Sequence, residues 1–284
     1  MNPKRGYALY ALTIFLSAFL LFQVQPLIGR MLLPWFGGAS AVWATSLLFF
    51  TAMLFCGYAY AYLISRLPYE KQARTHLKVL IGGALIVIGY LVVFQSPYPP
   101  LDWTINDTLP PILEVLLALA ITIGIPYFLL STTGPLVQYW FGVREAKEPY
   151  RLYVLSNLGS FIALGTYPFI IEPLFALSTQ SGVWTALFLA FIGLYCVITN
   201  AFLRAAREKS LLHGNENTRD DRLISRATRM QWIYYAALPA ALMVAVTSQL
   251  TQVVAPVPFL WVLPLALYLV SFIVAFRGWG GGGL

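Results

Sequence analysis

A small set of polar and charged side chains interrupts the long apolar stretches of this chain. Charged and amide groups are costly in an apolar environment, so they usually pair with one another or line a polar cavity. They are therefore the first residues to consider for binding chemistry. The set consists of Gln25, Arg30, Glu114, Asn157, Glu172, Gln249 and Gln252.

Glu114, Glu172 and Arg30 are expected on the same outer side of a membrane, near the ends of apolar segments, with the three glutamines at a similar depth. One interpretation is an outward-facing pocket whose carboxylates bind an organic cation such as a polyamine, with Tyr167 or Trp43 offering an aromatic face. The alternative is a structural Arg30–Glu172 pair, accompanied by interfacial side chains that reach toward water. Both interpretations are kept open.

A second polar group is expected on the inner side. Ser131, Thr132 and Thr133 precede Pro135, and Asn157 follows the start of another apolar segment. Hydroxyl groups commonly hydrogen-bond the backbone carbonyls that a proline leaves free in a membrane helix. A ligand site at this proline hinge is the alternative.

Composition places these residues in a membrane protein. Hydrophobic residues make up 59% of the chain and charged residues 10%, and the mean hydropathy is +0.73, values far from those of a soluble domain. A bilayer core takes roughly 20 apolar helical residues to cross, and a helix satisfies its own backbone hydrogen bonds in lipid. We predict an all-α bundle of about eight transmembrane spans, near 7–27, 41–64, 79–95, 112–133, 152–172, 183–203, 231–251 and 258–276.

Lysine and arginine predict the orientation, because they are retained on the cytoplasmic side of short loops. With the N-terminus inside, the predicted spans place every basic residue except Arg30 on the cytoplasmic side. Both termini are then cytoplasmic, in a multi-pass protein of the cell membrane. The net charge of +7 reflects this topology, so we expect the lipid bilayer, and not nucleic acid, as a partner.

The same segmentation predicts the domain organisation. Residues 1–203 form a six-span bundle and residues 204–229 a basic cytoplasmic linker. Residues 230–276 add two further spans, and 277–284 are a flexible glycine-rich tail.

Local signals refine this picture. Pro126 and Pro168 are expected to bend the fourth and fifth spans. Small residues at helical spacing from Ser156 to Ala163 predict close helix packing.

Residues typical of metal or cofactor sites are few. Cys56 and Cys196 fall in different predicted spans without metal-like spacing, and His76 and His213 are expected to be solvated in cytoplasmic loops. No strand followed by a glycine-rich turn and an acidic residue is found, and no nucleophile is spaced with a base. We therefore expect no cofactor, and this chain alone gives no basis for an enzyme.

Four groups of motifs occur in order along the chain. They are QPLIGRMLLPWFGG at 25–38, LSTTGPL at 130–136, PYRLY at 149–153 with SNLGS at 156–160, and VPFLWVLPLALY at 257–268. Together they resemble the membrane region of bacterial fused major-facilitator/spermidine synthase proteins. The resemblance implies a distantly facilitator-like membrane module that accompanies a soluble synthase-like domain, and that domain is not found in this sequence. The segment 65–71 also lacks the usual facilitator signature.

Two functional hypotheses follow from the residues and the resemblance. In the first, the chain is the membrane module of a spermidine synthase-like system and transports or presents a small amine or polyamine. In the second, it is a non-transporting anchor or assembly module that holds a catalytic domain or partner at the bilayer. The expected partners are the lipid bilayer, a cytosolic spermidine synthase-like domain and a small amine substrate.

Overall fold

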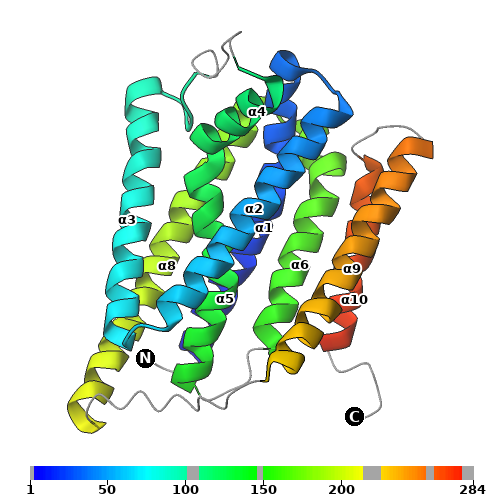
Figure 1. Ribbon diagram of the computed structural model, residues 1–284. Helices are drawn as coiled ribbons and strands as arrows, with labels where there is room; N and C mark the ends of the chain where they lie inside the picture. Colours follow the sequence, from blue (N-terminus) through cyan, green and yellow to red (C-terminus); the bar gives the residue numbers. More distant parts are fainter. Residues whose placement is uncertain (1–2, 101–108, 146–149, 214–224, 254–258, 277–284) are drawn as a thin grey trace.

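The computed structural model describes residues 3–100, 109–145, 150–213, 225–253 and 259–276. Nearly all of these residues lie in helices, and no strand occurs among them (Figure 1). Six of the helices in the described ranges are long and apolar enough to cross a membrane. The prediction of an all-helical chain with several membrane-crossing segments is confirmed to that extent.

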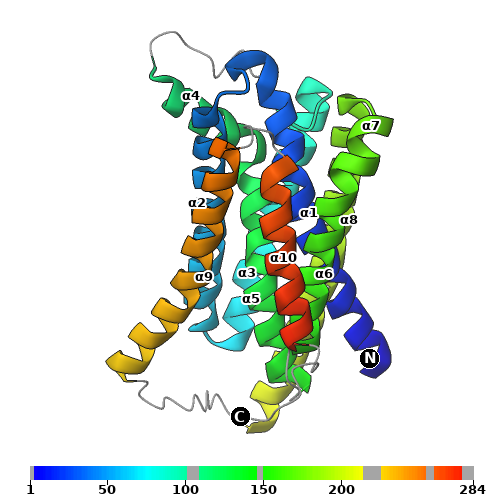
Figure 2. The ribbon, with the colours of Figure 1, turned by 90° about the vertical axis from the view of Figure 1, so that its right-hand side faces the viewer.

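The helices run along one common direction and form a single bundle (Figures 1 and 2). The six apolar helices are α1, α2, α3, the continuous unit α4–η2–α5, the unit α6–η3–α7, and α8, and the apolar part of α10 is shorter. Their bounds are α1 Pro3–Phe36, α2 Ser40–Ser65, α3 Tyr69–Phe94, α4 Pro111–Leu119, η2 Ala120–Gly124, α5 Ile125–Glu145, α6 Tyr150–Thr166, η3 Tyr167–Ile171, α7 Glu172–Leu174, α8 Leu177–His213, α9 Arg226–Val253 and α10 Phe259–Phe276.

The first helix is longer than the sequence predicts. The predicted span ends at 27, whereas α1 continues through Pro26 and Pro34 to Phe36. A proline removes one backbone hydrogen bond, but neighbouring groups in a membrane protein can satisfy the carbonyl that it leaves free. A proline alone therefore does not mark the end of this helix.

The third helix begins at Tyr69, well before the predicted start at 79. His76 consequently lies within α3 and is 0% exposed, so the prediction of a solvated loop histidine is wrong. The physical reason is that Lys71, Arg74 and Lys78 occupy the exposed face of α3, while His76 faces the bundle. Charge near a helix end does not exclude a buried face on the same turns.

π-helical turns interrupt two membrane-crossing helices next to proline. η2 ends shortly before Pro126, and η3 contains Pro168. A π turn pairs each N–H with the carbonyl five residues earlier, and such turns often occur at functional sites. The predicted bends at Pro126 and Pro168 coincide with these two turns.

α1 packs against α5, α6 and α8, while α10 packs against both α6 and α9. Figure 2 shows α6, α10 and α9 along one side of the bundle. The α1–α6 contact is close because Gly159 has no side chain: a Cβ there would lie 2.7 Å from the Phe15 main-chain oxygen. Ala163, one turn further along α6, is fully buried. The predicted small-residue packing surface of this helix is confirmed.

Basic residues gather at one end of the bundle. The α2–α3 turn, the start of α6, the last turns of α8 and the start of α9 meet at the lower end of Figure 1. Arg207 Nε donates to Glu70 Oε1 at 3.1 Å, which links α8 to α3 at this end. The basic residues of these segments are Arg66, Lys71, Arg74, Arg151, Arg204, Arg207, Arg226 and Arg229.

Candidate functional site

Four tyrosines from four different helices are linked by electrostatic interactions that centre on Tyr58. Tyr58 of α2 lies within electrostatic range of Tyr127 of α5, Tyr153 of α6 and Tyr268 of α10. We call these four residues the tyrosine cluster. Tyr127 is 1% exposed and Tyr58 is 51% exposed. The cluster therefore extends from the buried core to an accessible surface.

Two polar residues that the sequence singled out belong to this cluster. Gln25 Nε2 on α1 donates to the Tyr127 hydroxyl at 3.1 Å. Asn157 Nδ2 on α6 donates to the Tyr153 main-chain oxygen at 2.8 Å. Gln25 and Asn157 lie at different depths, because Gln23, two residues before Gln25 on α1, donates to the Ala163 main-chain oxygen at 3.0 Å, more than one turn beyond Asn157 on α6.

Other aromatic rings hold the tyrosines in place. The Phe50 ring lies with its centroid 4.9 Å from that of Tyr127. Phe276 lies 4.8 Å from Tyr153, and Phe272 lies 4.7 Å from Tyr268. Packed aromatic pairs of this kind are worth about 0.5–1.5 kcal/mol beyond their buried area, so they fix the orientation of the cluster.

The tyrosine cluster is uncharged. The interactions recorded for its four hydroxyls involve one another, Gln25 and Asn157, and no lysine, arginine or carboxylate in the described part of the chain. Phenol rings present a negative π face, and hydroxyl oxygens accept hydrogen bonds. Such a site can attract a cation without a compensating acid and does not attract an anion.

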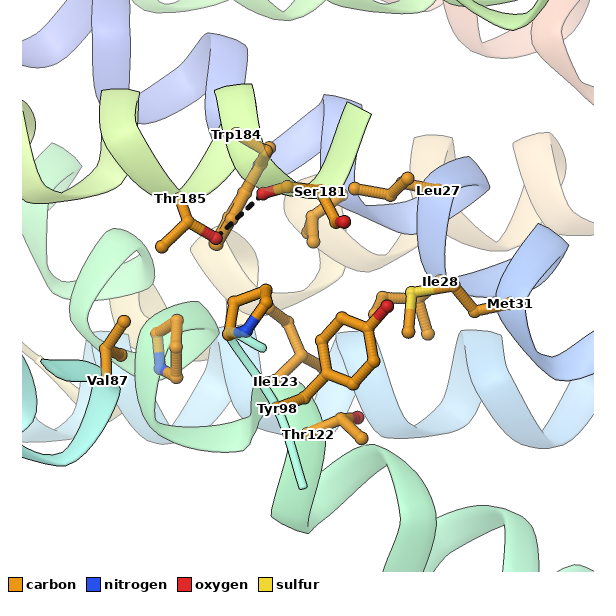
Figure 3. Close-up of a pocket in the computed structure, with 13 residues that line it drawn as sticks. Leu27, Ile28, Met31, Val87, Tyr98, Thr122, Ile123, Ser181, Trp184 and Thr185 are labelled. Atoms are coloured by element: carbon orange, nitrogen blue, oxygen red, sulfur yellow. Dashed lines mark hydrogen bonds between the residues drawn. The ribbon is translucent and has the colours of Figure 1, made fainter. Parts of the chain in front are cut away.

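Two small cavities lie toward the end of the bundle that is opposite the basic residues. The first has a volume of about 20 Å³ and is bordered by Ile28 of α1, Thr122 of η2, Tyr98 and Thr185 of α8 (Figure 3). That volume is enough for about one water molecule. Its lining is predominantly apolar, as Figure 3 shows, and it contains no charged residue.

The second cavity has a volume of about 90 Å³ and lies between α1, η3 and α8. Trp184 of α8 and Leu27 of α1 border both cavities. Trp184 Nε1 donates to the Leu20 main-chain oxygen on α1 at 3.0 Å. Gln23 and Tyr167 supply polar atoms to the second cavity, which has no carboxylate in its lining.

Part of the predicted outer polar group is assembled, but not as an ion pair. Arg30 Nη1 donates to the main-chain oxygen of Glu172 at 3.3 Å. Tyr167 interacts electrostatically with both Glu172 and Arg30, and its hydroxyl donates to Gln180 Oε1 at 3.0 Å. Glu172 itself is exposed. These residues form an outer polar group at the end of α6–η3–α7.

The other predicted residues are distributed elsewhere. Glu114 is buried on α4, which packs mainly against α2, whereas Glu172 lies on α7. Trp43 packs against α1, since a Cβ on Gly29 would meet its ring at 2.6 Å. Gln249 is exposed on α9. The side chain of Gln252 lies outside the described residues.

The inner hydroxyl groups bond within their own helix. Ser131 donates to the Tyr127 carbonyl at 2.8 Å, and Thr132 and Thr133 both donate to the Leu129 carbonyl. These carbonyls lie before the one that Pro135 leaves free, which belongs to Ser131. The predicted hydroxyl-to-carbonyl bonding occurs, but it is displaced from the proline.

Sequence reasoning missed the tyrosines of the cluster. The chain contains 17 tyrosines, most of them in apolar stretches, so residue type alone does not distinguish Tyr58 or Tyr268. The partial signal is the pair Gln25 and Asn157, because an intramembrane amide usually has a polar partner.

Comparisons with models of known protein families, with curated proteins and with solved structures give no match to this chain.

Proposed function

We propose that this protein is an eight-span membrane module that binds a small organic amine at the tyrosine cluster and transports or presents it. The observation that carries the proposal is that Tyr127, Tyr153 and Tyr268, on α5, α6 and α10, lie within electrostatic range of Tyr58 on α2, and that no cationic neighbour is found for them in the described residues. An ammonium group over a tyrosine face gains about 0.5–2 kcal/mol, more when water is excluded. A cation site built from rings also avoids burying a carboxylate.

The eight-span topology has both termini in the cytoplasm of a bacterial cell, with α9 and α10 as the last two spans. It is supported by the gathering of basic residues at one end of the bundle and by Arg30 lying beside α7 at the other. Tags in segments 96–111 and 204–229 should report from opposite compartments. Reports from the same compartment would contradict the topology.

Movement of the amine requires helices that can change shape. The two π turns provide weak points in α4–η2–α5 and α6–η3–α7, and these two units carry Tyr127 and Tyr153. Single π turns inside α-helices are frequent at functional sites. The two π turns therefore favour a function in which the helices move, such as amine transport, over that of a non-transporting anchor.

The resemblance to fused spermidine synthase-like proteins suggests a polyamine as the amine and a cytosolic synthase-like domain as the partner. The test is binding and uptake of labelled spermidine by the full chain in proteoliposomes. Tyr58→Leu and Tyr268→Leu should each weaken binding about 2- to 30-fold, the range that one cation–π contact supports.

Two variants serve as controls. Tyr234→Leu changes an exposed tyrosine, 61% accessible, on α9, and should leave binding unchanged. Glu172→Gln should also leave it unchanged, because Glu172 belongs to the outer polar group and not to the tyrosine cluster. Loss of binding in Glu172→Gln alone would instead favour the outer carboxylate pocket.

The second candidate is a non-transporting anchor or assembly module. The observation that favours it is the broad exposed apolar surface of α9, which includes Trp232, Ile233, Tyr235, Leu238 and Leu242. Lipid or a partner helix can cover such a surface. Absence of spermidine binding to the wild-type chain, together with correct membrane insertion, would support this candidate over the first.

A further inference from the structure

A second polar cluster lies fully inside the bundle, separate from the tyrosine cluster, and is centred on His76 of α3. The Tyr60 hydroxyl of α2 lies 3.1 Å from His76 Nδ1. The ring centroids of Tyr195 of α8 and Trp140 of α5 lie 4.7 and 5.7 Å from that of the imidazole. His76, Trp140 and Tyr195 are each 0% exposed. We call these four residues the histidine cluster.

The inner boundary of the histidine cluster is fully hydrogen-bonded. Trp140 Nε1 donates to Gln72 Oε1 at 3.0 Å. Gln72 Nε2 in turn donates to the main-chain oxygens of Ser65 and Leu67 at 3.1 and 2.7 Å. Phe202 stacks on Trp140 at 4.7 Å. This network closes the inner side of the cluster and fixes the position of Trp140.

Two buried polar atoms of the histidine cluster lack a hydrogen-bond partner in the described part of the chain. Within the described residues, His76 Nε2 and the Tyr195 hydroxyl have no hydrogen-bond partner of standard geometry. The Tyr195 hydroxyl lies close to the Thr132 and Thr133 side chains, whose hydroxyls donate to the Leu129 carbonyl and keep their oxygen lone pairs available to accept. Buried polar groups nearly always have a partner, either in the protein or in an ordered water. These two atoms belong to adjacent rings, so a single small molecule can form a hydrogen bond with each of them.

We propose that His76 Nε2 and the Tyr195 hydroxyl bind one buried water molecule, which connects α3 to α8. A buried water usually makes two to four hydrogen bonds. His76 Nε2, the Tyr195 hydroxyl and the oxygens of Thr132 and Thr133 supply that number of groups. A metal ion does not fit this site, because no cluster of metal-ligating side chains occurs among the described residues.

The bound water also sets the chemical state of the imidazole. A neutral imidazole has one nitrogen that donates and one that accepts, and the partner of each nitrogen selects its role. The Tyr60 hydroxyl is the hydrogen-bond partner of Nδ1, and the water is the partner of Nε2. Both nitrogens are then paired, which holds the ring in one orientation between α2 and α8 and accounts for a fully buried histidine without an acidic neighbour.

Histidine NMR tests the water site directly. The chain has two histidines, so His213→Gln leaves His76 as the source of all ¹⁵N-histidine signals from full-length protein in bilayers. We expect the His76 Nε2 signal to show hydrogen bonding and a through-space correlation to a water that exchanges slowly with bulk. An Nε2 signal without hydrogen bonding, or without this water correlation, overturns the proposal.

Tyrosine variants test the hydrogen bonds of the two His76 ring nitrogens separately. Tyr195→Phe should remove or strongly weaken the water correlation, whereas Tyr60→Phe should change the Nδ1 signal and retain the correlation at Nε2. Tyr234→Phe, on the exposed surface of α9, is the matched control and should change neither signal. A correlation that persists unchanged in Tyr195→Phe overturns the shared site. No amine is added, so the outcome is independent of the proposed amine binding.

Discussion

Replacement of Gly159 by alanine tests whether α1 and α6 are in as close contact as the structure shows. A Cβ at this position would lie 2.7 Å from the Phe15 main-chain oxygen and 3.4 Å from the Phe19 nitrogen. A backbone oxygen cannot rotate away as a side chain can. The two helices must therefore separate by several tenths of an ångström to accept one methyl group.

Gly165 on the same helix provides the reference for this change. A Cβ there would meet no atom within 4 Å. Alanine is favoured over glycine in a helix by about 1 kcal/mol, and this gain is common to both positions. Their difference isolates the steric cost, which is about 1–3 kcal/mol for one extra methyl in a well-packed site. We expect Gly159→Ala to be less stable than Gly165→Ala by that amount.

The assay is reversible unfolding of each variant in detergent micelles, compared with the wild-type chain. Because α1 carries Gln25 and α6 carries Tyr153 and Asn157, Gly159→Ala should also weaken spermidine binding, and Gly165→Ala should not. Equal unfolding free energies for the two variants, within about 0.5 kcal/mol, would refute the close contact and the placement of the tyrosine cluster that depends on it.

Three further predictions concern single hydrogen bonds and ion pairs. Gln25→Leu removes the donor to the buried Tyr127 hydroxyl, and should lower the unfolding free energy by about 1–3 kcal/mol, whereas Gln249→Leu on the exposed surface of α9 should not. Trp184→Phe removes the N–H bond to the main chain of α1 and should cost about 0.5–1.5 kcal/mol in the same unfolding assay, apart from any change in packing. Glu70→Gln weakens exposed pairs with basic side chains, and should cost less than about 1 kcal/mol, with a difference from wild type that shrinks in high salt.

The sequence predicts the class of the fold well, because helix formation in lipid depends on long apolar stretches. It fails where one helix has two different faces. The buried positions of α3 are Gln72, Ala73, His76, Leu80, Gly83 and Val87, a spacing of three to four residues that is typical of an amphipathic helix. A search for charge-free windows stops at Lys78 and misses this periodicity, which continues through the charged turns.

The candidate site is less predictable than the fold. Gln25 and Asn157 are recognisable because an amide in an apolar segment is unusual. Tyr58, Tyr153 and Tyr268 are not, since each becomes part of the cluster only when α2, α6 and α10 meet, and no local pattern specifies which helices are neighbours. The sequence therefore identifies the polar residues of the site and misses its aromatic surface.

α2 connects the two clusters that the structure reveals. Tyr58 and Tyr60 are two residues apart, and a helix turns by about 100° per residue, so their side chains leave nearly opposite faces of α2. Tyr58 faces the tyrosine cluster and Tyr60 contacts His76. One residue before Tyr58, a Cβ on Gly57 would lie 2.5 Å from Ser131 Cβ, so α2 and α5 are in direct contact. If an amine displaces α2 when it binds at Tyr58, the contact of Tyr60 with His76 must change as well. The histidine cluster would then report occupancy of the tyrosine cluster without touching the ligand.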